Sequence, residues 1–285
     1  TLFPYTTLFR SAKAREEGCE TALFLGDWHN NRASINIVTL NYSLKALEHL
    51  NENFDRVYFI PGNHDLYYRD KRDIQSVEWA RHLPNVEICN DWFNSGDVVI
   101  APWLVGDDHK RIPKLNAKYM FGHFELPHFY MNAMVQMPDH GEVKREHFGN
   151  FEHVFTGHFH KRQSNKNITY IGNCFPHNYA DAGDDERGMM ILEWGGQPEY
   201  HAWPGQPMYR VYKLSDLIST PEKLLADKQN EILAQQNQII NDINKKNEEA
   251  IAQLRDENIQ VQEALTKATI DKNKAVQQAK KIKDT

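Results

Sequence analysis

Residues 56–65 read Arg-Val-Tyr-Phe-Ile-Pro-Gly-Asn-His-Asp, an apolar run that leads into a polar loop. The short apolar run at 56–60, rich in aromatic and β-branched residues, is typical of a strand. Gly62 permits a tight turn directly after this strand. Asn63 then offers an amide oxygen, which is a ligand for hard metal ions, and the adjacent His64 could approach a substrate. The stretch therefore predicts a strand whose carboxyl end carries metal chemistry.

Three other stretches place metal-binding residues directly after short apolar runs. Asp27 follows the run 21–26, His123 follows a run centred on 119–121, and His158 and His160 follow the run 153–156. A His-x-His pair alone is common and is often only a pair of loop histidines. Four such sites, each next to a glycine at a strand end, are very hard to produce by accident.

The remaining apolar runs alternate with helical patterns and complete an α/β prediction. Apolar residues at helical spacing predict a helix over 34–50, and a glycine after a charged stretch predicts a helix end at 12–18. Further strands are expected at 98–101, 168–171 and 189–192. In this fold class the functional site lies at the carboxyl ends of the strands.

The four sites resemble the motifs of the calcineurin-like metallophosphoesterases, over roughly residues 12–195. Phe121-Gly-His-Phe-Glu-Leu126, Tyr170-Ile-Gly-Asn-Cys-Phe-Pro176 and Ala182-Gly-Asp-Asp-Glu-Arg-Gly188 resemble a narrower group. These are the nuclease subunits that pair with an SMC-like ATPase: the SbcD type of bacteria and the recombination endonuclease subunit of tailed bacteriophages. The resemblance implies an α/β sandwich of two mixed sheets flanked by helices, here followed by a long C-terminal helix.

The resemblance also implies a two-ion centre that hydrolyses phosphodiester bonds. Its metal ligands in this sequence are Asp27, Asn63, His123, His158 and His160. Asp27 would bridge two manganese ions, with magnesium as the alternative metal, and His160 would belong to the second ion. His64 would be the catalytic residue that stabilises the leaving group or the transition state. Two such ions activate a water molecule and hold the attacking and leaving oxygens in line.

The stretch 24–32, Phe-Leu-Gly-Asp-Trp-His-Asn-Asn-Arg, could match either of two motifs of this family. Asp27-x-His29 has the form of the first motif, and Gly-Asp has the form of the second. Asp27 and Asn63 are 36 residues apart, and this interval holds one predicted helix and one predicted strand. The only aspartate between residues 30 and 60 is Asp55, which precedes a strand. We therefore interpret Asp27 as the second motif and His29 as a coincidence.

This interpretation leaves the first motif, an Asp-x-His on the first strand, missing from the chain. Residues 1–11, TLFPYTTLFRS, match the translation of a common sequencing-library adaptor and are interpreted as a non-native leader. The alternative is a natural apolar N-terminal strand. The metallophosphoesterase domain is then expected at 12–205, without its first strand and first motif. The second metal site would keep only Asp27 and His160, so we expect this chain to be weakly active or inactive.

The C-terminal part of the chain has a different composition. Residues 206–220 are predicted to be a linker, and 221–285 contain no glycine and no aromatic residue. This segment predicts one long polar helix with a heptad column: Leu233, Ile240, Asn247, Leu254, Val261, Ala268, Ala275 and Ile282. It could form a coiled coil with a partner, or it could be a solvated tail.

Composition limits the partners and the compartment. A net charge of −6 argues against a large basic surface that binds nucleic acid unaided. Three scattered cysteines indicate a reducing compartment, and neither a membrane span nor a secretory signal is visible. We expect a cytoplasmic protein, in the host cytoplasm if it is phage-encoded.

The favoured function is a DNA exonuclease or endonuclease subunit that works with an SMC-like ATPase in recombination and repair. DNA and the ATPase are the expected partners, with a homodimer left open. One alternative is a free-standing metallophosphatase or phosphodiesterase that acts on phosphoproteins or nucleotides. Another is a non-catalytic assembly subunit.

Several residues have a structural and a functional interpretation. Trp28 and Trp103 could stack on bases, although core packing is the more frequent role of tryptophan. Lys161 and Arg162 could contact a DNA backbone or form a solvated strand edge. The acidic run 184–186 is expected to be a solvated turn.

Overall fold

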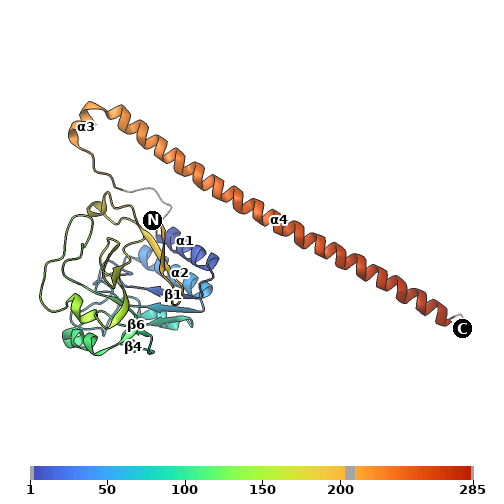
Figure 1. Ribbon diagram of the computed structural model, residues 1–285, viewed down its shortest axis with the longest axis horizontal. Helices are drawn as coiled ribbons and strands as arrows, with labels where there is room; N and C mark the ends of the chain where they lie inside the picture. Colours follow the sequence, from blue (N-terminus) through green and yellow to red (C-terminus); the bar gives the residue numbers. More distant parts are fainter. Residues whose placement is uncertain (1–2, 203–208, 284–285) are drawn as a thin grey trace. The chain divides into compact units, whose positions relative to one another are not determined.

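The computed structural model describes residues 3–202 and 209–283 (Figure 1). The chain divides into two compact units, one extending to Val211 and the other beginning at Tyr212. Of the predicted linker 206–220, residues 206–208 lie outside the described part of the chain; the rest spans this division and contains a short helix, α3 (Leu214–Ser219). Among the described helices, none is both long and apolar enough to cross a membrane.

The first sheet of unit 1 has three parallel strands in the order β1-β2-β3. These strands are β1 (Thr21–Phe24), β2 (Arg56–Phe59) and β3 (Val86–Ile88). Helix α2 (Ile37–Asn53) connects β1 to β2, and the Asn36 side chain caps its N-terminus by accepting from the Val38 N–H. Leu47 of α2 is fully buried among residues of this sheet.

The second sheet has six strands in the order β4-β5-β6-β7-β9-β8. The strands are β4 (Phe93–Asn94), β5 (Val98–Ile100), β6 (Ala117–His123), β7 (Phe151–Gly157), β8 (Gln163–Asn165) and β9 (Ile168–Tyr170). The four central strands β5, β6, β7 and β9 are parallel, and the edge strands β4 and β8 are antiparallel.

Alternating side chains of both sheets separate into different cores, as the period of two in a strand requires. In β2, Val57 and Phe59 face the helix side, whereas Tyr58 lies in a cluster shared with the second sheet. In β6, Tyr119 and Phe121 belong to this shared cluster. The two sheets therefore pack face to face through one apolar layer.

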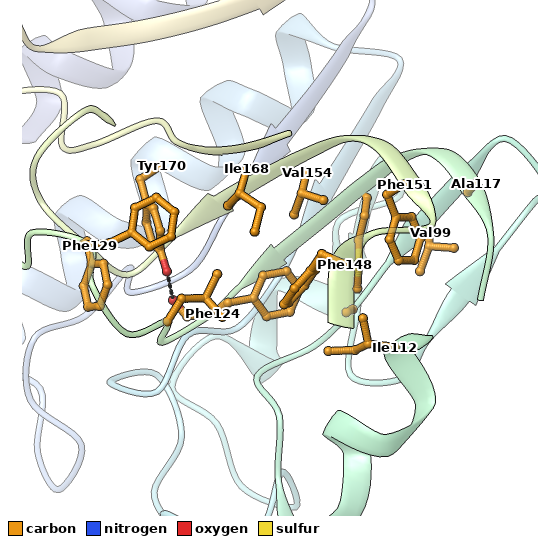
Figure 2. Close-up of a cluster of buried hydrophobic side chains, with 14 of the residues drawn as sticks. Val99, Ile112, Ala117, Phe124, Phe129, Phe148, Phe151, Val154, Ile168 and Tyr170 are labelled. Atoms are coloured by element: carbon orange, nitrogen blue, oxygen red, sulfur yellow. Dashed lines mark hydrogen bonds between the residues drawn. The ribbon is translucent and has the colours of Figure 1, made fainter. Parts of the chain in front are cut away.

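The opposite face of the second sheet has its own core, which Figure 2 shows in close-up. Phe124, Phe148 and Tyr170 are fully buried there beneath the loops. The Tyr170 hydroxyl donates to the Phe124 carbonyl at 2.9 Å, and Figure 2 draws this bond as a dashed line. This contact fixes the chain directly after His123, where β6 ends.

Shorter elements complete unit 1. Strands β10 (Gly188–Leu192) and β11 (Pro198–Ala202) form an antiparallel pair. Four 3-10 helices are η1 (Glu78–His82), η2 (Gly106–Lys114), η3 (Arg145–Phe148) and η4 (Tyr179–Asp181). The α/β class and the long C-terminal helix are confirmed. The expectation of two mixed sheets is wrong, because the first sheet is entirely parallel and a third, two-stranded sheet is present.

Helix α1 (Phe3–Glu16) runs through the boundary predicted between the leader and the domain at residues 11 and 12. Ser11 is buried, and Ala14 packs against the core of the first sheet. Figure 1 shows α1 beside α2, and the two helices are in contact. The alternative of an N-terminal strand is therefore wrong for the described residues.

Unit 2 consists mainly of the helix α4 (Pro221–Lys283). Pro221 stands in its first turn, where a missing N–H costs no hydrogen bond. Leu233, Ile240, Leu254 and Val261 of the heptad column are between 53% and 66% exposed. These four residues form a solvent-facing apolar stripe, and the coiled coil stays a prediction.

Candidate metal centre

Four of the predicted site residues stand where strands end. Asp27 and Asn63 follow β1 and β2, and His123 is the last residue of β6. His158 follows β7, whose last residue, Gly157, pairs with His123 across the parallel strands. Because the ends of parallel neighbours meet at one sheet edge, side chains far apart in sequence come together here.

The orientation of the His123 ring is fixed by a backbone carbonyl. His123 is fully buried, and its Nδ1 lies 2.6 Å from the carbonyl oxygen of Leu25. A carbonyl can only accept, so Nδ1 carries the proton and donates it. The neutral ring then presents the bare lone pair of Nε2, which lies 3.2 Å from Asp27 Oδ2 and 3.2 Å from Asn63 Oδ1.

His158 is oriented in the same way by a carboxylate. Its Nε2 lies 3.1 Å from Oε2 of Glu125 and donates to it. This hydrogen bond lowers the pKa of Glu125, which keeps the carboxylate ionised and accepting. The bare Nδ1 of His158 then lies 3.1 Å from His123 Nε2 and 3.0 Å from Asn63 Oδ1.

Four acceptor atoms therefore converge with no donor among them when both imidazoles are neutral. Ligand atoms of Asp27, His123 and His158 all lie within 4.8 Å of one another. Ligands about 2.1 Å from a common ion, at right angles to each other, are about 3 Å apart. The separations of His123 Nε2 from the other three atoms and of His158 Nδ1 from Asn63 Oδ1, 3.0 to 3.2 Å, match this value. The group fits a divalent cation that accepts both nitrogen and oxygen ligands.

Burial and the neighbouring charges shift the pKa values of Asp27, His123 and His158. Burial opposes the ionisation of Asp27, but His123 and the backbone N–H of His64 outweigh it and hold the pKa of Asp27 below its usual range. Burial also opposes the charge of His123, yet Asp27 raises its pKa. Burial lowers the pKa of His158.

Two of the ligands have an unusual backbone conformation. Asp27 has φ of 60° and His158 has φ of 82°, in the left-handed region that non-glycine residues rarely adopt. Such strain costs on the order of 1–3 kcal/mol and is typical of functional sites. Close packing of the two loops requires Gly62, because a Cβ there would lie 2.4 Å from the backbone nitrogen of Asp27.

Asp65 connects the loops that carry Asp27 and Asn63 by accepting hydrogen bonds from the backbone of both. Its Oδ2 accepts from the backbone N–H of Gly62 at 2.9 Å and of Trp28 at 3.1 Å, and its Oδ1 accepts from His29 at 2.9 Å. Burial, followed by the nearby charge of Asp27, raises the pKa of Asp65 to about 6. Asp65 was not among the predicted site residues, although it ends the quoted motif.

His29 points into the protein interior. Its ring nitrogens lie 2.7 Å from the Ser76 hydroxyl and 2.9 Å from the Ser43 hydroxyl of α2. Burial lowers its pKa to about 4, so the ring is neutral. This internal role agrees with the interpretation that His29 is not a metal ligand of a first motif.

His64, the predicted catalytic residue, lies beside Asp27. Its backbone N–H donates to Asp27 Oδ1 at 2.9 Å, and its Nδ1 donates to the carbonyl of Asn30 at 2.8 Å. These two contacts leave Nε2 of His64 as the nitrogen that can act on a substrate.

His160 is not part of the converging group within the described residues. Its Nδ1 lies 3.5 Å from Asp181 Oδ1, and the His177 ring is 5.3 Å away between centroids. Burial lowers the pKa of His177 to about 4, with the nearby His160 adding to this effect. Of the ligands that the family resemblance assigns to a second ion, the described chain supplies Asp27 and His160 alone, which does not fit a complete site.

A buried ionic cluster holds the His160 backbone. Arg187 is 1% exposed and donates to the His160 carbonyl at 3.0 Å. It also pairs with Asp181 at 3.1 Å and with Asp184 at 3.0 Å. The expectation of a solvated turn at 184–186 is therefore wrong at Asp184, because a buried guanidinium needs carboxylate partners.

The tryptophans and the basic pair that could contact DNA lie in different environments. Trp28 is buried in the core of the first sheet. Trp103 is half-buried, and its ring lies 5.3 Å from His158 and 5.7 Å from His123 between centroids. Arg162 stacks over the Tyr200 ring, 4.5 Å from its centroid, and donates to the Ile171 carbonyl. Lys161 lies 4.0 Å from Asp184.

No protein-family model matches this chain. The chain is a distant homologue of "Exonuclease subunit 1" from Enterobacteria phage T4, with 26% identity over 191 residues. The match covers 63% of this chain and 55% of the phage protein. The chain thus spans about half the length of this curated relative.

Proposed function

We propose that this chain is a metal-dependent DNA nuclease subunit with a calcineurin-like metallophosphoesterase body. The observation that carries the proposal is the convergence of four acceptor atoms. His123 Nε2 lies 3.1 to 3.2 Å from Asp27, Asn63 and His158, and His158 Nδ1 lies 3.0 Å from Asn63 Oδ1. The distant similarity to a phage exonuclease subunit supports DNA as the substrate. A metal centre that acts on DNA would hydrolyse phosphodiester bonds.

In this proposal the four residues hold one manganese ion, with magnesium as the alternative. When bound, such an ion acts as a Lewis acid on a phosphoryl oxygen and lowers the pKa of a bound water. Leu25 and Glu125 keep the two imidazoles in the tautomers that direct bare nitrogens inward. His64 presents Nε2 to the leaving oxygen or to the charge that develops on the phosphate.

The second ion of the family would be held by Asp27 and His160 with further ligands. Because the described donors do not complete this site, we propose that this chain is weakly active or inactive. Holding one ion well and the second poorly would lower turnover without abolishing metal binding. The proposed domain is 12–205, and residues 206–220 link it to the C-terminal helix.

The proposed partners are DNA and an SMC-like ATPase. Helix α4 exposes Leu233, Ile240, Leu254 and Val261 at seven-residue multiples, which suits docking on a coiled coil. Pairing of two copies of α4 into a homodimer is the alternative use of the same stripe. The complex would work in the cytoplasm, which is the host cytoplasm for a phage-encoded protein.

The test compares three substrates with manganese and with EDTA: end-labelled double-stranded DNA, a single strand, and bis-p-nitrophenyl phosphate. Wild type and His123→Ala are assayed in parallel. The proposal expects slow manganese-dependent release of nucleotides that His123→Ala abolishes. Hydrolysis of the small diester without any DNA cleavage would favour a free-standing phosphodiesterase. A chain that binds no manganese in calorimetry would favour the non-catalytic assembly subunit.

A further inference from the structure

The loop that follows the Asn63-His64 motif is a closed and anchored structure. Leu66 and Gln75 form an antiparallel bridge at its base, and both are buried. The Tyr67 N–H donates to the Ile74 carbonyl at 2.9 Å and continues the pairing. This loop, residues 66–75, is therefore held in a defined conformation next to the metal centre.

The loop presents aromatic surface to solvent. Tyr67 is 50% exposed and Tyr68 is 40% exposed, and their rings meet edge to face at 5.0 Å between centroids. Ile74, across the loop from Tyr67, is 52% exposed. Three large side chains of one short loop are thus exposed to solvent.

A second contact joins the loop to the metal centre. Arg72 donates to the Trp103 carbonyl at 2.8 Å and pairs with Asp108. The Trp103 ring in turn lies 5.3 Å from the ring of His158. The loop is therefore tied to the metal centre through the Asn63-His64 motif at one end and through Arg72 and Trp103 at the other.

The charges of the loop indicate what it could bind. Arg72 is neutralised by Asp108, and the exposed Arg69 and Lys71 are balanced in number by Asp70 and Asp73. A neutral loop does not hold a phosphate backbone by charge. Exposed aromatic rings bind unpaired bases by stacking, which depends little on sequence or on net charge.

Given these contacts, and resting on the proposed nuclease function, we propose that Tyr67 and Tyr68 form a stacking platform for unpaired bases of the DNA strand whose phosphate enters the metal centre. The platform binds single-stranded or frayed ends in preference to closed duplex. It positions a strand from the base side, whereas the metal centre engages the phosphate.

The test is binding of a fluorescein-labelled thymidine 20-mer by the full chain in EDTA, measured by fluorescence anisotropy. Tyr67→Ala/Tyr68→Ala should weaken binding about ten-fold or more, because each lost stacking partner removes a base contact. The matched control is Tyr130→Ala/Tyr212→Ala, which removes two tyrosines that are 43% and 46% exposed outside the loop. The control should stay within about two-fold of wild type.

Two further measurements make the result decisive. Tyr67→Phe/Tyr68→Phe keeps both rings and should bind like wild type. This result would show that the rings, and not the hydroxyl groups, are needed for binding. The slope of log Kd against log salt concentration should be the same in wild type and in the alanine variant, because no charge is removed. A labelled duplex of the same length is titrated in parallel. The proposal is overturned if wild type does not bind the 20-mer, if the alanine variant binds like wild type, or if binding of the duplex falls equally.

The nuclease proposal can fail separately. Its test is manganese binding by wild type and by His123→Ala in calorimetry. If wild type binds no manganese but the tyrosine-to-alanine variant still loses binding of the single strand, the stacking platform stands and the nuclease function falls.

Discussion

Replacing Gly62 with alanine tests the geometry of the metal centre with a single methyl group. A Cβ at residue 62 would lie 2.2 Å from Asp27 Oδ1, 2.4 Å from the Asp27 backbone nitrogen and 2.8 Å from Asp27 Cγ. An ordinary contact of a Cβ atom begins at 3.4 Å. The loops that carry Asp27 and Asn63 must therefore separate by about 1 Å, and no rotamer change can relieve a clash with backbone.

The expected cost follows from this displacement. Overpacking costs about 1–3 kcal/mol. In a domain of this size, each kcal/mol lowers the melting temperature by about 2–4 °C, so the expected fall is roughly 2–12 °C. A displacement of about 1 Å in an active site lowers the rate by about 100-fold. Manganese affinity should fall together with the rate, because Asp27 and Asn63 no longer converge with the two histidines.

The assay is calorimetric titration with manganese chloride together with thermal unfolding in EDTA. Gly149→Ala is the matched control, since Gly149 is exposed, has right-handed helical backbone angles, and its added Cβ would meet only the Glu146 carbonyl at 3.4 Å. The control should behave as wild type. If Gly62→Ala binds manganese as tightly as wild type and melts at the same temperature, the close packing of the two loops is not what places the ligands.

Three further predictions concern contacts around the centre. Glu125→Gln should weaken manganese binding about ten-fold in calorimetry, with little change in melting temperature. The reason is that it removes the charge that holds the His158 tautomer. An unchanged affinity would contradict this role. Arg187→Met should lower the free energy of unfolding by about 3–5 kcal/mol in urea titrations, since Asp181 and Asp184 lose their buried partner; a loss below about 1 kcal/mol would show that the cluster is not needed. Manganese at about 100 times its Kd should stabilise wild type by about 2.7 kcal/mol in thermal unfolding but leave His123→Ala unchanged, and equal shifts in both would place the ion elsewhere.

The sequence predicts that four ligands lie close together, because each of them follows a short apolar run. These ligands are Asp27, Asn63, His123 and His158. Parallel strands bring their carboxyl ends to one edge, so the position in each strand was enough to place the residue. The partners that orient them could not be predicted in the same way. The acceptor for His123 is the carbonyl of Leu25, a backbone atom that leaves no trace in residue type.

The burial of the charged residues Asp184 and Arg187 could not be predicted from the sequence either. Asp184 and Arg187 stand in a run of charged residues that local composition assigns to a solvated turn. Arg187 is buried because it satisfies the His160 carbonyl and two carboxylates at once, which is a tertiary arrangement. The arginine in an otherwise acidic run directly before Gly188 and an apolar strand was the available signal.

The sequence analysis also did not predict the number of strands or the purely parallel direction of the first sheet. Strands β3, β4 and β8 have two or three residues, too few for an alternating pattern to appear. The purely parallel first sheet depends on the crossover connections between its strands, such as helix α2, whereas the expectation of mixed sheets came from a family resemblance. The stretch 3–16 is one helix, and its first part was interpreted as a leader because of its likeness to adaptor sequence.

The most direct test of the central claim is the number of manganese ions that the full chain binds, measured by isothermal titration calorimetry with His123→Ala in parallel. The account predicts one ion per chain at high affinity, lost in His123→Ala, because Asp27, Asn63, His123 and His158 converge on a single point. Wild type that binds no manganese, or that binds it equally well after His123 is removed, would contradict the account.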